Sequence, residues 1–198
     1  MIESTKDLRT TLEESIQNSS KVFVVGHNSP DFDAIGSAIG LSVLVEWLGK
    51  TAFIVVDDEE SKIEPGVKKI LDQNRERFHI IRKKEFLKKT DKKSLLIVTD
   101  VNKAPMISVG DSIDKVGHVI VIDHHNEDTT TLPVEDRFIS LDSSSACEIV
   151  TRILTASKVP YNKDVANYLL AGISLDTKRF KQNTTDKTHE VAEKLLRN

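Results

Sequence analysis

Several features that mark whole classes of protein are rare in this sequence or missing from it. Its 198 residues include one cysteine, Cys147, so no internal disulfide can form and a reducing compartment is expected. Aromatic residues make up only 5% of the chain, and no apolar run is long enough to cross a bilayer. The first residues are polar and partly acidic, unlike a signal peptide, which predicts a cytoplasmic location.

A strong positive charge is also missing. The chain has 28 basic and 31 acidic residues, and its formal net charge of −3 argues against a broad contact with duplex nucleic acid. Charged residues are 30% and hydrophobic residues 38% of the sequence, which is typical of a globular protein. We therefore expect one globular domain over residues 1–198, or one domain plus part of another, and a few local basic residues could still serve a small phosphate-bearing substrate.

The sequence does contain an alternation of short apolar runs and helix-like segments. The apolar runs are rich in β-branched residues and lie at 22–25, 53–56, 95–98 and 119–122, with weaker ones at 78–81 and 138–141. Helices are predicted over 5–18, 33–48, 145–156, 163–174 and 187–197, and after Pro65. This pattern predicts an α/β fold: a mainly parallel sheet of about five strands flanked by helices, with a helical C-terminal segment.

Acidic and imidazole side chains follow the strongest predicted strands. They are His27, Asp31 and Asp33 after the run at 22–25, Asp100 after 95–98, and Asp123, His124 and His125 after 119–122. We expect Asp176, which follows the apolar stretch 169–175, to reach the same place. Ligands of open parallel sheets bind beyond the carboxyl ends of the strands, so these groups are expected to converge at one edge.

This mixture of carboxylates and imidazoles suits Mn²⁺ or Mg²⁺ better than a zinc site rich in thiolates. Pro30 disfavours helix at Ser29, which places Asp31 and Asp33 in a turn where their carboxylates can face adjacent metals. Two ions about 3.5–4 Å apart can clamp a phosphoryl group. Taken alone, the two aspartates are equally well explained as helix caps, and a histidine pair like that at 124–125 is more often structural than metal-binding. Their joint occurrence at successive strand ends nevertheless favours a site for two metal ions.

Three other features need an interpretation. Two of them have both a functional and a structural explanation, and the third has only a structural one. The serines at 143–145 could contact phosphate, but Ser145 and Glu148 also match the capping box of a helix, which we favour. The pair Lys178-Arg179 could neutralise phosphate charge or be solvated. Trp47 is expected to pack in the core.

The order of these motifs resembles the DHH phosphoesterase superfamily. The resemblance spans about residues 20–195 and rests on Gly26-His27-x-x-Pro30-Asp31-x-Asp33-Ala34-Ile35-Gly36, Asp100, Asp123-His124-His125 and Asp176-Thr177. It implies a Rossmann-like domain that hydrolyses phosphoesters with two Mn²⁺ ions, or Mg²⁺. By this resemblance, His27 and Asp31 bind one ion, and Asp33, His124 and Asp176 bind the other. Asp100 would bridge both ions and take part in catalysis, and His125 would contact the scissile phosphate.

Within the superfamily, residues 33–40, 100–103 and 170–180 most resemble the DHH domain of GdpP-type cyclic di-AMP phosphodiesterases. This implies an Mn-dependent phosphodiesterase that converts cyclic di-AMP to a linear dinucleotide. Residues 183–185 resemble nanoRNases, which cut very short RNA and dephosphorylate a bisphosphorylated adenosine. Family II inorganic pyrophosphatases share the metal motifs, although the context of Asp176 is less like theirs.

The nucleotide-cleaving relatives carry a following DHH-associated domain with a glycine-rich motif, and that motif is not found here. We therefore expect either an excised piece of a longer protein, whose parent could be membrane-anchored, or a minimal relative. Besides cyclic di-AMP hydrolysis, a nanoRNase-like activity, a pyrophosphatase activity and a catalytically weak nucleotide-binding fragment stay open. The expected partner is a small nucleotide, with a homodimer as the candidate assembly.

Overall fold

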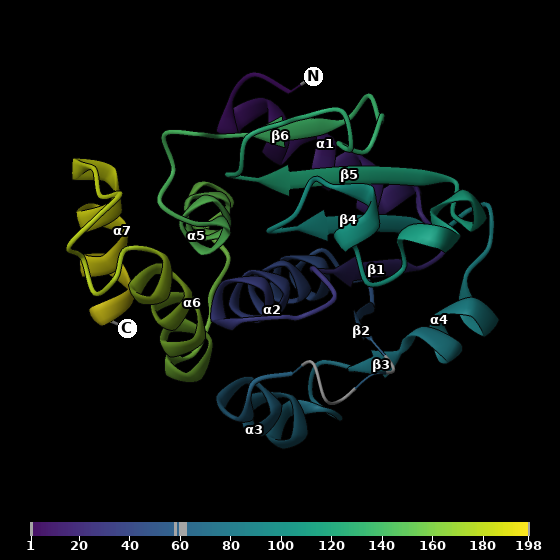
Figure 1. Ribbon diagram of the computed structural model, residues 1–198, viewed down its shortest axis with the longest axis horizontal. Helices are drawn as coiled ribbons and strands as arrows, with labels where there is room; N and C mark the ends of the chain where they lie inside the picture. The colour runs from purple at the N-terminus through teal and green to yellow at the C-terminus, as the bar shows by residue number, and fades with distance from the viewer. Residues whose placement is uncertain (1, 58, 60–62, 198) are drawn as a thin grey trace.

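A single parallel sheet organises the chain. The computed structural model describes residues 2–57, 59 and 63–197, and within them six strands pair in the order β3-β2-β1-β4-β5-β6 (Figure 1). The strands are β1 (Val22–Val25), β2 (Ala52–Val56), β3 (Ile81–Arg82), β4 (Leu95–Thr99), β5 (His118–Asp123) and β6 (Arg137–Ile139). This is the strand order of a Rossmann-like sheet, so the predicted α/β fold is confirmed.

The sheet has six strands where about five were predicted, and the weak apolar runs explain the difference. Strand β3 contains two residues, and Ile81 pairs with Val55. The predicted strand at 78–81 was therefore placed too early. Phe78 and Ile80 are buried in the core, but they lie in the connection between α3 and β3. Their apolar character reflects tertiary packing and not a strand.

The helices follow the predicted ranges to within two residues at most ends. They are α1 (Thr5–Asn18), α2 (Phe32–Trp47), α3 (Pro65–Asn74), α4 (Lys83–Lys89), α5 (Ala146–Ala156), α6 (Lys163–Asp176) and α7 (Asp186–Leu196). Short 3₁₀ helices η2 (Ala104–Met106) and η3 (Gly110–Lys115) follow β4. None of the helices in the described ranges is long and apolar enough to span a bilayer.

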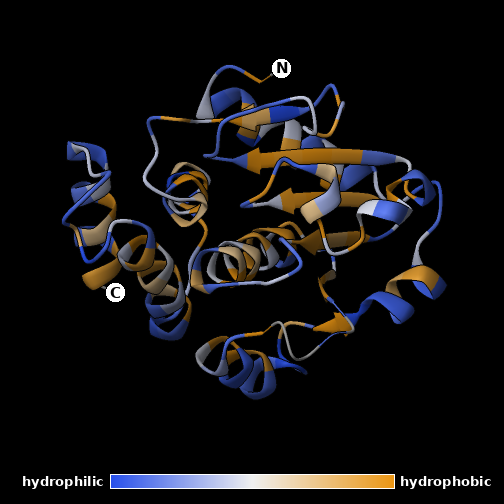
Figure 2. Ribbon diagram, in the orientation of Figure 1, coloured by the Kyte–Doolittle hydropathy of each residue, from blue (hydrophilic) through white to orange (hydrophobic). Residues whose placement is uncertain are grey.

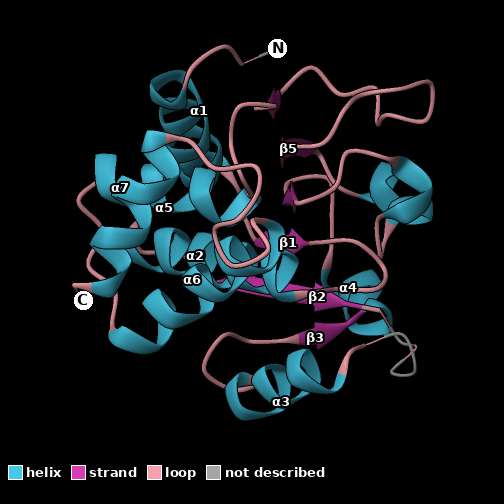
Figure 3. Ribbon diagram, turned by 60° about the vertical axis from the view of Figure 1, so that its left-hand side comes forward, coloured by secondary structure: helices cyan, strands magenta, loops and turns pink. Residues whose placement is uncertain are grey.

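Both faces of the sheet are covered, as a parallel sheet requires. Val24 and Ile97 point into the larger core with α1, α2, α5 and α6, whereas Phe23 and Val98 point into a smaller core with α4. Figure 3 shows the larger group of helices on one side of the sheet and α4 on the other, and Figure 2 shows the hydrophobic strands between them. Helix α7 packs outside α6.

The prediction that Trp47 packs in the core was wrong. Its side chain is 56% exposed because it is the last residue of α2, where the helix leaves the core. The predicted capping box before α5 is half right. Ser145 Oγ accepts a hydrogen bond from the Glu148 backbone N–H at 3.0 Å, but the Glu148 carboxylate accepts from Ser144 and not from Ser145.

Candidate metal centre

The carboxyl ends of β1, β4 and β5 meet at one edge of the sheet. The sheet order reverses between β1 and β4, and ligands of such folds bind in the crevice at that point. His27 lies two residues after β1, Asp100 directly follows β4, and Asp123 is the last residue of β5. The strand ends therefore bring together groups that are up to about one hundred residues apart in sequence.

The first group of possible ligands consists of His27, Asp31 and Asp100, whose ligand atoms lie within 4.8 Å of one another. His27 Nε2 is 3.6 Å from Asp100 Oδ2 and 3.8 Å from Asp31 Oδ1. Asp31 also caps helix α2, because its Oδ1 accepts from the backbone N–H groups of Asp33 and Ala34 at 2.8 and 3.0 Å. A capping role and a place in the cluster are therefore compatible at Asp31.

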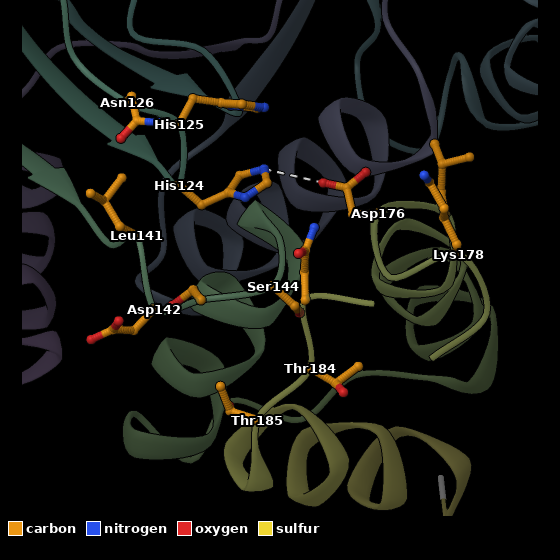
Figure 4. A pocket seen from close by; sticks show the side chains of 13 residues that line it. His124, His125, Asn126, Leu141, Asp142, Ser144, Asp176, Lys178, Thr184 and Thr185 are labelled. Atoms are coloured by element: carbon orange, nitrogen blue, oxygen red, sulfur yellow. Dashed lines mark ion pairs between the residues drawn. The ribbon is translucent and has the colours of Figure 1, made fainter. Parts of the chain in front are cut away.

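The second group shares Asp100 with the first and adds Asp33, His124 and Asp176. His124 Nε2 lies 3.1 Å from Asp176 Oδ2, the pair joined in Figure 4. The same nitrogen is 3.3 Å from Asp100 Oδ1 and 3.7 Å from Asp33 Oδ2. The six proposed ligands thus lie in two adjacent groups with Asp100 common to both.

Asp176 reaches the centre from a different kind of element than the sequence suggested. It was expected with the groups at strand ends, but it is the last residue of α6. The helix continues two residues beyond its predicted end, and this last turn carries the carboxylate to His124.

Asp33 is held by the start of another helix. Its side chain is fully buried, and its two oxygens accept from the backbone N–H groups of Ala146 (2.7 Å) and Cys147 (2.8 Å) in α5. Its side chain therefore bonds the first turn of α5 and not its own helix. Burial raises the pKa of Asp33, and the charges of Asp100 and Asp176 raise it further.

The acidic groups stabilise the protonated, positively charged forms of His27 and His124, and the two histidines stabilise the deprotonated form of Asp100. Burial alone would lower the pKa of His124, but Asp100 and Asp176 outweigh it and raise that pKa to about 11. Burial likewise opposes the charged form of His27, whereas Asp100 and Asp31 raise its pKa to about 10. Burial would raise the pKa of Asp100, yet His124 and His27 hold it at about 2.

The donor set fits a hard divalent cation. Asp100 Oδ1 and His124 Nε2 are buried and lie 3.3 Å apart, but neither makes a hydrogen bond of normal geometry among the described residues. Buried polar atoms normally make well-formed hydrogen bonds, so atoms that converge on one point without them indicate a missing partner. Oxygen and imidazole donors in this ratio suit Mn²⁺ or Mg²⁺.

His125 projects from the same turn toward solvent. Its side chain is 55% exposed, and its Nδ1 is 2.9 Å from Asp123 Oδ1, an interaction that raises the pKa of His125. Asp123 Oδ1 also accepts from the His124 backbone N–H at 2.8 Å, so one buried carboxylate holds the backbone of His124 and orients the ring of His125. Asn102 Nδ2 donates to the His125 carbonyl at 3.0 Å. Sequence reasoning assigned no role to Asn102, although its position two residues after Asp100 was a signal.

The centre opens into two hollows. A cleft of about 680 Å³ lies on the side of His124 and Asp176, and its lining includes Ser144, Lys178 and Thr185 (Figure 4). The other hollow, of about 460 Å³, includes His27 and Asp100. Of the basic pair after Asp176, Lys178 lines the larger cleft.

Comparison with known proteins places the chain in a family. Residues 21–173 match the model of the DHH family, N-terminal domain. The chain belongs to the DHH family.

The chain resembles several curated relatives over most of its length. It is 33% identical over 189 residues to "Cyclic-di-AMP phosphodiesterase PdeA" of Listeria monocytogenes, covering 91% of this chain but 28% of that protein. It is 31% identical over 187 residues to a "Probable manganese-dependent inorganic pyrophosphatase" of Archaeoglobus fulgidus, covering 89% and 55%. The chain therefore spans about a quarter to about half the length of these relatives.

A solved structure confirms the fold. The exopolyphosphatase-related protein of Bacteroides fragilis superposes with a TM-score of 0.74 at 22% identity, over 97% of this chain and 56% of that one.

Proposed function

We propose that this chain is the catalytic part of a metal-dependent phosphodiesterase that hydrolyses a small nucleotide, with cyclic di-AMP as the substrate. The observation that carries the proposal is the pair of ligand groups joined by Asp100. We assign His27 and Asp31 to one ion, and Asp33, His124 and Asp176 to the other. Two divalent ions held there would withdraw charge from the phosphate and lower the pKa of an attacking water.

The protein groups around this centre suit the stabilisation of a phosphate. Asp123 engages His125 Nδ1, which leaves Nε2 of the exposed ring available to donate to a non-bridging phosphate oxygen. Lys178 lies on the cleft wall and would add positive charge. Asp100 would hold the two halves of the site at a constant separation.

The choice of substrate rests on the relatives. PdeA, at 33% identity, is named a cyclic di-AMP phosphodiesterase, whereas the pyrophosphatase relative is named for a much smaller substrate. The two hollows beside the centre could take the nucleosides on either side of a scissile phosphate, which pyrophosphate lacks.

The test compares four substrates in Mn²⁺: cyclic di-AMP, a short RNA, a bisphosphorylated adenosine and pyrophosphate. We expect a linear dinucleotide from cyclic di-AMP, and loss of turnover in Asp31→Ala and His124→Ala. Turnover of pyrophosphate alone, or of short RNA alone, would select the corresponding relative. Turnover unchanged in the two variants would refute the metal centre, and nucleotide binding without turnover would indicate a binding module.

A further inference from the structure

A buried carboxylate lies behind the larger cleft, outside the two ligand groups. Glu148, in the first turn of α5, has a fully buried side chain. Its Oε2 accepts from Ser144 N–H at 3.0 Å, from Ser144 Oγ at 2.7 Å and from Thr188 Oγ1 at 2.8 Å. Its other oxygen, Oε1, has no hydrogen-bond partner among the described residues and lies 3.9 Å from Arg152 Nη1, so Oε2 makes the hydrogen bonds that offset the cost of burying this carboxylate.

These donors connect Glu148 to two separate walls of the cleft, which Ser144 and Thr185 line. Ser144 precedes α5 and lines the cleft beside Asp176. Thr188 lies in the first turn of α7, where its hydroxyl also accepts from the Thr185 backbone N–H at 3.0 Å. Thr185 lines the cleft, and Figure 4 shows Thr184 and Thr185 on the side of the cleft away from His124. Glu148 therefore connects the two walls through hydrogen bonds, directly to Ser144 and through Thr188 to Thr185.

We propose that Glu148 is a positioning residue that sets the width of this cleft for the nucleotide beside the scissile phosphate. The inference rests on the proposed function, because it assumes that a nucleotide occupies the cleft. The walls offer hydroxyl and amide groups, as from Ser143, Ser144 and Asn183, and such groups suit ribose hydroxyls and phosphate oxygens. Hydrogen bonds from two walls act together only when the separation of the walls is constant.

The role differs from simple stabilisation. An acidic residue in the first turn of a helix stabilises that helix whatever lies nearby. If this were the whole role of Glu148, removing its bond to α7 would lower stability and leave substrate binding unchanged. A positioning role predicts a rise in KM for a substrate that fills the cleft, with no change for one that does not.

Thr188→Val is the sharpest variant, because it keeps the shape of the side chain and removes the hydroxyl that reaches Glu148. The matched control is Thr151→Val, a buried threonine of α5 whose hydroxyl donates to the Cys147 carbonyl at 2.7 Å. Both are assayed on cyclic di-AMP and on bis(p-nitrophenyl) phosphate, a phosphodiester without nucleosides. Mn²⁺ affinity and Tm are measured for each.

For Thr188→Val we expect a KM for cyclic di-AMP about tenfold higher, with kcat on bis(p-nitrophenyl) phosphate and Mn²⁺ affinity unchanged. Thr151→Val should match wild type in KM. Glu148→Gln keeps an acceptor oxygen and should have a smaller rise in KM than Glu148→Ala, and this pair decides the question if Thr188→Val does not fold.

Equal KM values in Thr188→Val and Thr151→Val, or equal losses on both substrates, would overturn the inference. Failure of the proposed function gives a different result: wild type itself would then hydrolyse no cyclic di-AMP. In that case the positioning role for a nucleotide is rejected together with the substrate.

Discussion

Asp100 combines strain, burial and charge in one residue. Its backbone has a φ of 59°, in the left-handed region that residues other than glycine rarely adopt, and its side chain is 3% exposed. Such strain costs on the order of 1–3 kcal/mol and persists when the surroundings determine the conformation. Here the conformation directs the carboxylate between His27 and His124.

Asp100→Asn tests this residue with almost no change in shape. The amide removes the negative charge shared by both ligand groups and offers one poorer donor oxygen. We expect Mn²⁺ affinity to fall by at least about 100-fold in titration calorimetry. Residues that only support metal ligands contribute up to about 100-fold, and a direct ligand should contribute at least as much. Asp142→Asn, at the rim of the cleft, is the control and should bind Mn²⁺ like wild type. Equal affinity in both variants would contradict the bridging role.

If His27 and His124 are ligands, metal binding should depend on pH. His27 and His124 have pKa values of about 10 and 11, so both are cations at neutral pH in chelated protein. A ligating histidine must be neutral, and protons therefore compete with the metal at all pH values below these pKa values. The competition weakens as pH rises, so affinity should increase with pH.

We expect Mn²⁺ affinity to rise between about pH 6 and pH 8, with roughly two protons released for each chain that binds its metals. Calorimetry in buffers with different ionisation enthalpies measures the release. His189→Gln, on the exposed face of α7, should change neither quantity. An affinity that is independent of pH, with no proton release, would show that these histidines are not ligands.

Among the elements, three helix ends build the second ligand group. The start of α2 supplies Asp33, the start of α5 supplies the amides that hold it, and the end of α6 supplies Asp176. Helices α2 and α6 must approach closely, and Gly172 permits this. A Cβ at Gly172 would lie 2.8 Å from Asp33 Oδ1 and 2.5 Å from Cys147 Sγ.

Gly172→Ala should therefore displace a ligand as well as disturb the packing of the helices. Gly40→Ala is the matched control, since a Cβ there would meet Val150 at 2.6 Å in the same group of helices but away from the ligands. Both should lose about 1–3 kcal/mol of stability from overpacking. Only Gly172→Ala should also weaken Mn²⁺ binding, by about tenfold or more. Equal Mn²⁺ affinity in the two variants, measured by calorimetry, would refute this difference.

For the whole molecule, the proposed metal centre joins segments from most of the chain, from His27 to Asp176. The buried carboxylates repel one another, and bound cations remove that repulsion in the folded state alone. Mn²⁺ at about one hundred times its dissociation constant should add about 2.7 kcal/mol, or about 5–10 °C in Tm for this length. Differential scanning fluorimetry measures the shift, and chelation should reverse it. His124→Ala removes a proposed ligand of one of the two ions, so its shift should be clearly smaller than that of wild type, and a wild-type response in that variant would contradict the proposed site.

Local patterns predicted most of the architecture. The β-branched runs predicted β1, β2, β4 and β5 within a residue or two, because fully buried strands need continuous apolar sequence. The apolar run at Phe78 was less informative. Phe78 is buried in the core, but it lies outside any strand. The prediction for Trp47 was wrong for a different reason. Its apolar sequence neighbours suggested burial, but they do not reveal that the end of the helix is exposed.

The sequence by itself determined the parallel sheet and placed acidic and imidazole groups after its strands, because strand ends of a parallel sheet share one edge. Only the tertiary structure decided that α6 extends to Asp176 and brings it to His124, and that the amides of α5 hold Asp33. It also decided that Glu148 joins two walls of the cleft. Each of these contacts depends on the packing of helices far apart in sequence, which no local periodicity encodes.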